Sequence, residues 1–417
     1  MTVQRVYFDH AATTSMLPQA RAAWLTVSDQ VGNASSLHTS GRAARRVVES
    51  SRESIAADLG IRPSAVIFTG GGTESDNLAI KGMYWARCAQ LEKQSLTIVT
   101  SGIEHHAVLD PVLWLREHDR ADVRFVNADA QGRVNSGDIE SALEAGGVAL
   151  VSIMWANNEI GAIQPVHEIA LICRKFDVPF HTDAVQALGQ LPLDLRGLDA
   201  AAVTLSSHKI GGPVGIGALI IDPTVKFTPV QHGGGQEREI RSGTFDPASI
   251  AAFAAAVRHA ISGLDEHATR LRELQEYLVS AITSAVPEAI FNGPPPGEMR
   301  LPNNTHFSFP GCEGDSLLML LDAAGIDCST GSACTAGIPE PSHVLLSMGL
   351  TKKLPAHRFA LVWVAIVRKR GLITWHKHCQ VLSSVPNVQD RCPDEKASRD
   401  LSYERRSGLL RGNSPHD

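Results

Sequence analysis

The sequence predicts an α/β protein built on a mostly parallel sheet, together with a second, smaller domain. Short apolar or β-branched runs alternate along the chain with longer amphipathic or alanine-rich runs, as strands and helices do in such proteins. Polar and glycine-rich motifs directly follow several apolar runs, and open α/β sheets bind their ligands at the carboxyl ends of strands. The length of 417 residues exceeds what one hydrophobic core usually supports.

Five apolar runs have the length and composition of buried strands. They are Leu96 to Thr100, Val148 to Met154, Val178 to Thr182, Ala201 to Leu205 and Ala218 to Ile221. The segment HEIALICRKF, which begins at His167, has apolar residues at helical spacing. From about Ser249 to Ile282 the chain is rich in Ala, Leu, Glu and Arg and lacks Pro, which predicts one long helix joining the two domains.

Composition and charge exclude several classes of protein. Hydrophobic residues make up 43% and charged residues 20%, as in ordinary globular proteins, and no apolar run is long enough to cross a bilayer. A net charge of -6 gives no electrostatic basis for binding nucleic acid. The start, MTVQRVYFDHAATT, does not have the pattern of a secretory signal, so we expect a cytoplasmic protein. Seven cysteines without paired CxxC motifs indicate free thiols.

The motif TGGGTESDN, from Thr69 to Asn77, follows the apolar segment AVIF and precedes a helical run. Its glycines and threonine would direct backbone N–H groups and the positive end of a helix toward a phosphate. A plain strand-to-helix turn is the commoner explanation of such a motif taken alone. The motif has neither the Lys of a Walker loop nor the spacing of a dinucleotide fingerprint, which disfavours nucleotide binding.

Two further motifs follow predicted strands. HTDAVQ, from His181 to Gln186, places Asp183 where it could pair with the protonated ring nitrogen of an aromatic cofactor. Taken alone, this Asp is more simply a helix cap. SSHKIGGPVGIG, from Ser206 to Gly217, places Lys209 between a strand and a glycine-rich turn. A lysine so placed can lose its solvation and form a Schiff base, whereas most lysines are solvated surface charges.

Small residues surround two thiols in CSTGSACTAG, from Cys328 to Gly337. A thiol in such a loop can reach a bound substrate, provided that a nearby cation or base lowers its pKa. The alternative is a small buried cysteine, and this interpretation is applied to Cys88, Cys173, Cys312 and Cys328.

Together these motifs resemble the cysteine desulfurases, which are pyridoxal-phosphate enzymes of the aminotransferase class V group with fold type I. SACT around Cys334 is typical of the branch whose catalytic cysteine lies on a long mobile loop. The resemblance extends over YFDHAATT at Tyr7, GNASSLHTSG at Gly32, EHHAVL at Glu104, WANNEIG at Trp155, HGGGQEREIRSGT at His232 and EPSHVLLSMGL ending at Leu350.

The resemblance implies a particular architecture. Residues 14–258 are expected to form a large cofactor-binding domain, with a mostly parallel seven-stranded sheet between helices. Residues 1–13 and 259–350 are expected to form a small α+β domain that carries the loop of Cys334.

The resemblance also implies a role for each matching residue. Lys209 forms the Schiff base with pyridoxal 5'-phosphate and later moves the α-proton of the substrate. Asp183 pairs with the pyridine nitrogen, Gln186 bonds to the ring hydroxyl, and His105 stacks on the ring as a candidate acid–base group. Asn158 approaches both the cofactor and the substrate carboxylate. The expected phosphate contacts are Gly72, Thr73, Ser206, His208 and, from the other subunit of a homodimer, Thr244.

The implied reaction takes sulfur from L-cysteine. The amine of cysteine displaces Lys209, the cofactor ring stabilises the carbanion, and the thiolate of Cys334 attacks the substrate sulfur. L-Alanine leaves, and the persulfide on Cys334 passes to an iron–sulfur scaffold or a thiolation enzyme. Cys334 is also a candidate transient ligand of an iron–sulfur cluster. The alternatives are a selenocysteine lyase or aminotransferase of the same superfamily, and a catalytically impaired remnant that still binds the cofactor and dimerises.

After Leu350 the resemblance ends. The family has an Arg here that grips the substrate carboxylate, whereas this chain reads TKKLPAHRFALVWVAIVRKRGLITWHKHC, with Arg358 among unrelated neighbours. Reading the degenerate codons of residues 356 to 374 from their third bases permits ASLRFSLGRHSTEAGID, which matches the missing segment. We therefore hypothesise a frameshift near residues 351 to 356, which makes residues 351–417 an aberrant tail that is disordered or poorly packed. A basic interaction tail is the rival interpretation.

Overall fold

The computed structural model describes residues 5–312, 314–329, 342–349 and 359–365. Within them a seven-stranded sheet has the order β2-β8-β7-β6-β5-β3-β4. All pairs in this sheet are parallel except those of β8, which runs antiparallel to β2 and β7. The predicted fold class is therefore confirmed. The strands are β2 (Val66–Thr69), β3 (Thr97–Ser101), β4 (Asp122–Val126), β5 (Val148–Ser152), β6 (Phe180–Asp183), β7 (Ala202–Ser206) and β8 (Gly217–Ile221).

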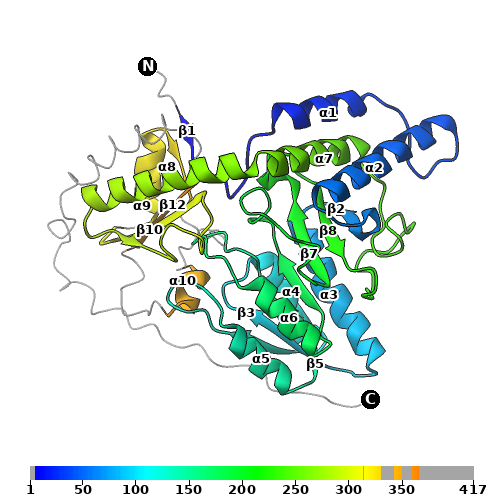
Figure 1. Cartoon of the computed structure of the whole chain (residues 1–417), viewed down its shortest axis with the longest axis horizontal. Helices are drawn as coiled ribbons and strands as arrows, with labels where there is room; N and C mark the ends of the chain where they lie inside the picture. The colour runs from blue at the N-terminus through cyan, green and yellow to red at the C-terminus, as the bar shows by residue number, and fades with distance from the viewer. Residues whose placement is uncertain (1–4, 313, 330–341, 350–358, 366–417) are drawn as a thin grey trace, which may run out of the picture.

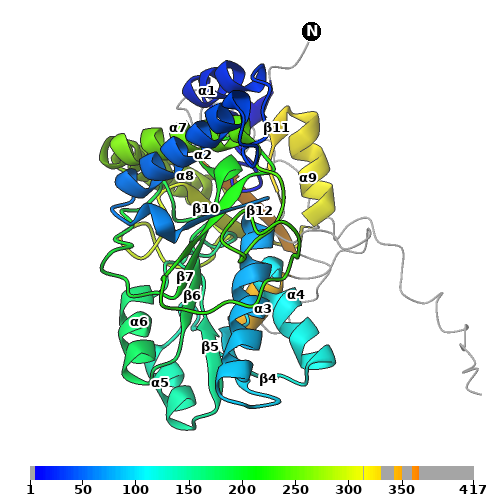
Figure 2. The same ribbon diagram turned by 90° about the vertical axis from the view of Figure 1, so that its right-hand side faces the viewer.

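Helices cover both faces of this sheet. Figure 2 shows α5 (Ser136–Glu144) and α6 (Val166–Lys175) on one side and α3 (Gly72–Gln90) and α4 (His106–His118) on the other. Each face buries its own apolar cluster against the sheet. The first cluster also takes in α1 (Pro18–Ser28), α2 (Thr39–Asp58) and α7 (Pro247–Ser262), which pack together at the end of the molecule that carries β2 (Figure 1).

A smaller body packs around a separate apolar cluster. In it β10 (Asn304–Pro310) is the middle strand between β9 (Ile290–Phe291) and β12 (Phe359–Ala365), and both neighbours run antiparallel to it. The amino-terminal β1 (Val6–Tyr7) joins this body because it pairs in parallel with β11 (Ile326–Asp327). Helices α8 (Leu264–Ala285) and α9 (Gly314–Ala323) supply much of the cluster, which includes Phe8, Leu271, Phe307, Leu321 and Ile326. The boundaries given above for the two domains stay a prediction.

The prediction of a single long helix from Ser249 to Ile282 is wrong, because the helical stretch is divided in two. The structure has two helices, α7 and α8, which meet at Gly263. Glycine is a poor helix former, and here it both ends α7 and precedes the first residue of α8. The first helix packs on α1 and α2 of the sheet domain, whereas α8 belongs to the smaller body.

Part of the segment that the sequence predicts to be an aberrant tail forms a strand. Residues 359–365 make β12, which pairs with β10 along its whole length, from Pro310 opposite Phe359 to Asn304 opposite Ala365. The run FALVWVA is rich in β-branched and aromatic residues, and such residues favour strands. The rest of the predicted tail, including Arg358, lies outside the described residues.

Candidate active site

The candidate cofactor residues gather at the carboxyl ends of two central strands. Asp183 is the last residue of β6, and Ser206 is the last residue of the adjacent β7. Lys209 follows in the short 3-10 helix η2 (Ser207–Lys209). Gly72 begins α3 beside them, since a Cβ atom on it would lie 3.6 Å from Ser206 Cβ. Parallel strands bring these separate motifs to one edge of the sheet.

Lys209 is half-buried and points toward the amino-terminal segment. Its Nζ donates to the carbonyl oxygen of Ala11 and, at 3.0 Å, to that of Ala12. Burial lowers the pKa of Lys209 to about 8, although the charges of Asp183 and Asp9 act in the opposite direction. A larger share of this amine is therefore neutral near physiological pH than of an exposed lysine, as a nucleophilic lysine requires.

This pKa predicts how cofactor loading of the apoprotein depends on pH. Only the neutral amine attacks an aldehyde, so the neutral fraction limits the rate below the pKa. We expect the rate of pyridoxal 5'-phosphate attachment to rise about tenfold per unit from pH 6 and to level off above about pH 8. Visible absorbance after rapid mixing measures this rate. A rate that keeps rising to pH 10 would show that the pKa of Lys209 is not lowered.

Asp183 is buried, and its Oδ1 accepts a 2.8 Å hydrogen bond from the backbone N–H of Val185. Burial raises its pKa to about 6, while the Val185 hydrogen bond and the charge of Lys209 lower it. Behind it, burial and the charge of Asp183 raise the pKa of Asp76 well above its usual range. Asp183 is therefore the carboxylate of this pair that carries the charge at neutral pH, and it can pair with a protonated ring nitrogen.

The start of α3 fits a phosphate group. Gly71 has a φ of 142°, which an L side chain rarely adopts, and α3 begins at the next residue. A Cβ on Gly72 would approach Val185 Cγ2 to 3.1 Å, so only glycine leaves the space open. The hydroxyl of Ser206 faces this region and is buried without a hydrogen-bond partner among the described residues. Free N–H groups of a helix start and an unsatisfied hydroxyl are suitable donors to phosphate oxygens.

His105 caps α4, and its Nδ1 accepts a 3.1 Å hydrogen bond from the N–H of Ala107. Although His105 is exposed at the surface, desolvation by its surroundings and the charge of Lys209 lower its pKa to about 4. The ring is therefore neutral at physiological pH, and its remaining proton lies on Nε2. A neutral imidazole can stack on an aromatic ring, and its Nε2–H group can donate a hydrogen bond.

The DHAATT segment, residues 9–14, contacts several predicted site residues, although no role was predicted for it. Besides Lys209, Gln186 donates through Nε2 to the Ala11 carbonyl oxygen at 3.2 Å. His208 Nδ1 lies 3.1 Å from Thr13 Oγ1. Only the resemblance to the family, which includes this motif, could have indicated that it lies at the site. Its composition alone does not indicate a binding site.

The remaining predicted residues differ in how the structure places them. Asn158 is half-buried in the turn after β5, whereas Thr73 and Thr244 are exposed. The loop that carries Thr244 is fixed by two ion pairs, Glu237 with Arg52 at 3.0 Å and Arg241 with Glu74 at 2.7 Å. Because Glu74 also accepts from the N–H of Gly70, this loop is tied to the turn that precedes α3.

Cys334 lies outside the described residues, and four other thiols are free within them. Cys328 is half-buried, and burial together with the nearby acids Asp9, Asp327 and Asp322 raises its pKa to about 12. Burial likewise raises the pKa of Cys173 to about 12. A thiol with such a high pKa is a poor nucleophile. This agrees with the prediction that Cys173 and Cys328 are structural cysteines.

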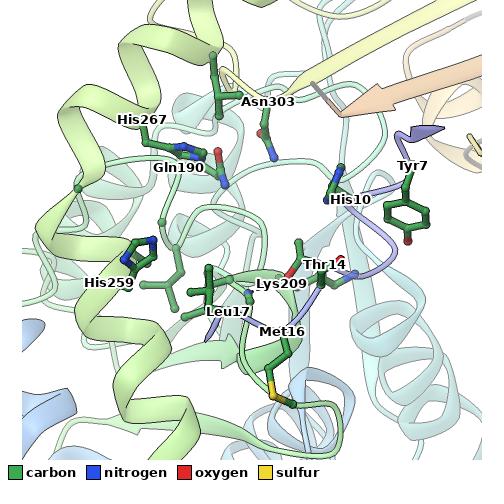
Figure 3. Close-up of a pocket in the computed structure, with 18 of the residues that line it drawn as sticks. Tyr7, His10, Thr14, Met16, Leu17, Gln190, Lys209, His259, His267 and Asn303 are labelled. Carbon is green, nitrogen blue, oxygen red and sulfur yellow. Dashed lines mark hydrogen bonds between the residues drawn. The ribbon is translucent and has the colours of Figure 1, made fainter. Parts of the chain in front are cut away.

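A cavity of about 880 Å³ opens beside Lys209. Figure 3 shows Lys209 between the amino-terminal segment with Tyr7 and His10 and the helices that carry His259 and His267. A cavity of this volume is large enough for a small molecule. In the part of the chain that the structure describes, no cluster of three or more His, Cys, Asp or Glu side chains could hold a metal ion. No helix there combines the length and apolarity that a membrane span needs.

Residues 6–368 match the protein family described as aminotransferase class-V. The chain belongs to this family. An IscS-like cysteine desulfurase of Mycobacterium tuberculosis is 54% identical over 345 residues, which cover 82% of this chain and 87% of that protein. A cysteine desulfurase IscS of Dictyoglomus turgidum is 41% identical over 362 residues, which cover 86% of this chain and 90% of that protein.

Solved structures of class-V relatives share the fold. A NifS-like protein has a TM-score of 0.82 at 33% identity, and the match covers 91% of this chain and 99% of that one. A NifS-like protein from Rickettsia africae has a TM-score of 0.81 at 30% identity, with 92% and 100% covered. The comparisons confirm the cysteine desulfurase family, the function and the fold class predicted from the sequence.

Proposed function

We propose that this class-V protein removes sulfur from L-cysteine with bound pyridoxal 5'-phosphate, releasing L-alanine and leaving a persulfide on Cys334. The observation that carries the proposal is the convergence of a lysine of lowered pKa, Asp183, and the helix start at Gly72 beside the unsatisfied hydroxyl of Ser206. When bound, the cofactor supplies an electron sink for the carbanion that forms at the substrate Cα. The residues of one subunit that would hold it are Gly72, Thr73, His105, Asn158, Asp183, Gln186, Ser206, His208 and Lys209.

The residues of the chain supply the proton transfers and the nucleophile. Lys209, partly neutral near pH 8, accepts and returns the α-proton of the substrate. His105, neutral because its pKa is about 4, carries a proton on Nε2 and is the second candidate acid–base group at the site. The Cys334 thiolate attacks the substrate sulfur, so an S–S bond forms while the Cβ–S bond breaks. The electron pair stays with carbon, which is then protonated to give alanine.

The protein acts in the cytoplasm as a homodimer that completes each site with the partner subunit. Thr244 is exposed on its own subunit, which leaves it accessible to a second copy. The thiol of Cys334 is regenerated only when an acceptor takes the sulfur of the persulfide. An iron–sulfur scaffold or a thiolation enzyme is therefore the expected partner. Cys334 is also the candidate ligand of a transient iron–sulfur cluster.

The departure from the family after Leu350 reflects a shifted reading frame and reduces activity. Loss of the carboxylate-binding arginine weakens substrate positioning, which costs rate as well as affinity. Sequencing the gene tests the shift, because Phe359 followed by Ala360 can encode only Arg or Cys in the alternative frame and must encode Arg. A cysteine codon, or any stop, in that frame between residues 356 and 374 would contradict it.

The activity is tested with the purified full chain, L-cysteine and a reducing thiol. We expect alanine and sulfide in equal amounts, together with visible absorbance of the protein-bound cofactor. Absorbance without turnover would contradict the proposed activity and favour the impaired remnant. Selenide release from selenocysteine without sulfide release from cysteine would favour a lyase instead.

A further inference from the structure

The turn after β5 is fixed by the side chain of Asn157, which is fully buried. Its Oδ1 accepts from the N–H groups of Glu159 and Ile160, both at 2.9 Å, and its Nδ2 donates to the Ile103 carbonyl oxygen at 2.9 Å. Gly161 closes the turn with a φ of 69°. Asn158, the predicted contact to cofactor and substrate, therefore projects from a backbone with little freedom.

The smaller body holds the same turn from the other side. Asn304, in β10, donates through Nδ2 to the carbonyl oxygens of Asn158 at 3.2 Å and Glu159 at 2.9 Å. Its own Oδ1 accepts from Arg300, a fully buried guanidinium, at 3.0 Å. A Cβ on Gly161 would lie 2.8 Å from Asn304 Oδ1, so the Asn304 side chain packs directly against this glycine. The turn is thus clamped between the two bodies.

The side chain of Glu159 reaches a different segment. The Ser342 hydroxyl donates to Glu159 Oε2 at 2.5 Å, and the two residues are only 1% and 2% exposed. Ser342 is the N-cap of α10 (His343–Ser347), and it follows Cys334 by eight residues. Burial raises the pKa of Glu159 to about 7, while the hydrogen bond from Ser342 favours its charged form. Removing either partner leaves a buried polar group unsatisfied.

Helix α10 also contacts the segment that carries His105. His343 Nε2 bonds to the Glu104 carbonyl oxygen at 2.9 Å, and its ring centroid lies 4.9 Å from that of His106. Val344 and Leu345 pack with Ile103, Met154, Ile160 and Ala162. Ser342 and His343 therefore join the start of α10 to the turn that carries Asn158 and to the segment that carries His105.

We propose that Glu159 and Ser342 are positioning residues, which anchor the carboxyl-terminal end of the Cys334 segment to the turn that carries Asn158. The proposal rests on the role of Cys334 proposed above. Eight residues span at most about 28 Å, so the anchor limits the volume that the Cys334 thiol can reach. Confining a nucleophile near its target raises its effective concentration, and releasing the anchor dilutes it.

The test compares Ser342→Ala and Glu159→Ala with Ser347→Ala. Ser347 is a matched control because it lies in the same helix and also makes a hydrogen bond, to the Gly102 carbonyl oxygen at 2.9 Å. Single-turnover mass spectrometry measures persulfide formation on Cys334. We expect it to slow about tenfold in Ser342→Ala and Glu159→Ala and less than about twofold in Ser347→Ala. Ser342→Thr, which keeps the hydroxyl, should restore the rate.

Two readouts separate positioning from a general structural defect. In Ser342→Ala and Glu159→Ala, the cofactor absorbance should respond to L-cysteine as it does in the wild-type chain, with the same dependence on cysteine concentration. The double variant should be no slower than either single one, because the pair acts as a unit. A normal persulfide rate in Ser342→Ala, or an equal loss in Ser347→Ala, would overturn the proposal.

Hydrogen exchange tests the anchor without turnover. We expect the α10 amides to exchange at least about tenfold faster in Ser342→Ala and Glu159→Ala than in Ser347→Ala. Equal exchange in all three variants overturns the anchor even if the wild-type chain forms no persulfide. An absent wild-type persulfide with the expected exchange pattern would instead count against the proposed function alone.

Discussion

Replacing Lys209 with alanine should lower turnover of L-cysteine by at least about 1,000-fold and remove the pyridoxyl group that borohydride fixes to the protein. Both effects have one cause, because the same amine joins the cofactor and moves the α-proton. Alanine and sulfide assays measure the first effect. Peptide mapping after reduction measures the second, since the adduct must lie on the peptide that contains Lys209.

Lys175→Ala is the control for this variant. Lys175 is exposed and pairs with Glu140 on the surface, so its loss should change turnover by less than about twofold. Thermal unfolding of both variants checks that the fold survives. A pyridoxyl adduct on another lysine would refute the assignment and, with it, the proposed site.

Replacing Cys334 with serine should lower turnover by at least about 1,000-fold while the cofactor still binds and still responds to L-cysteine. A serine hydroxyl is almost wholly protonated and attacks sulfur poorly, so the step after α-proton removal is the one that fails. Visible absorbance follows cofactor and substrate binding, and the sulfide assay follows the failed step.

Cys328→Ser is the matched control, because Cys328 lies in the same motif. Its half-buried thiol has a pKa raised to about 12, so it supplies almost no thiolate, and the variant should keep turnover within about twofold. Turnover that survives Cys334→Ser but is lost in Cys328→Ser would reverse the assignment of the nucleophile.

Five strands of the sheet were predictable because each is a short apolar run. Asp183 and Ser206, for example, end β6 and β7 as the motifs HTDAVQ and SSHK indicate. The edge strand β4 was not predicted, because its sequence DVRFV mixes charged and apolar residues and most of it is not buried. The break at Gly263 was not predicted, because one glycine in a window rich in helix formers changes local propensity only slightly. The pairing of β12 with β10 depends on a partner some 50 residues earlier, which no local pattern contains.

The candidate site was predictable only in part. Lys209 and Asp183 follow strands, so their types and positions predict the chemistry. Their altered pKa values arise from burial and from each other, which only the folded chain sets. The contacts of Ala11 with Lys209 and Gln186 join residues more than 170 positions apart. They could not be predicted, because every residue has a backbone carbonyl group and the sequence does not show which one accepts a hydrogen bond.

The junction at Gly263 has a mechanical consequence for the cavity beside Lys209. His259, on α7, and His267, on α8, both line that cavity, as does Gly263 itself. Since α7 packs on the sheet domain and α8 on the smaller body, Gly263 is a point at which the chain can bend when one body moves against the other. The width of the space beside the reactive amine is therefore coupled to the angle between the bodies.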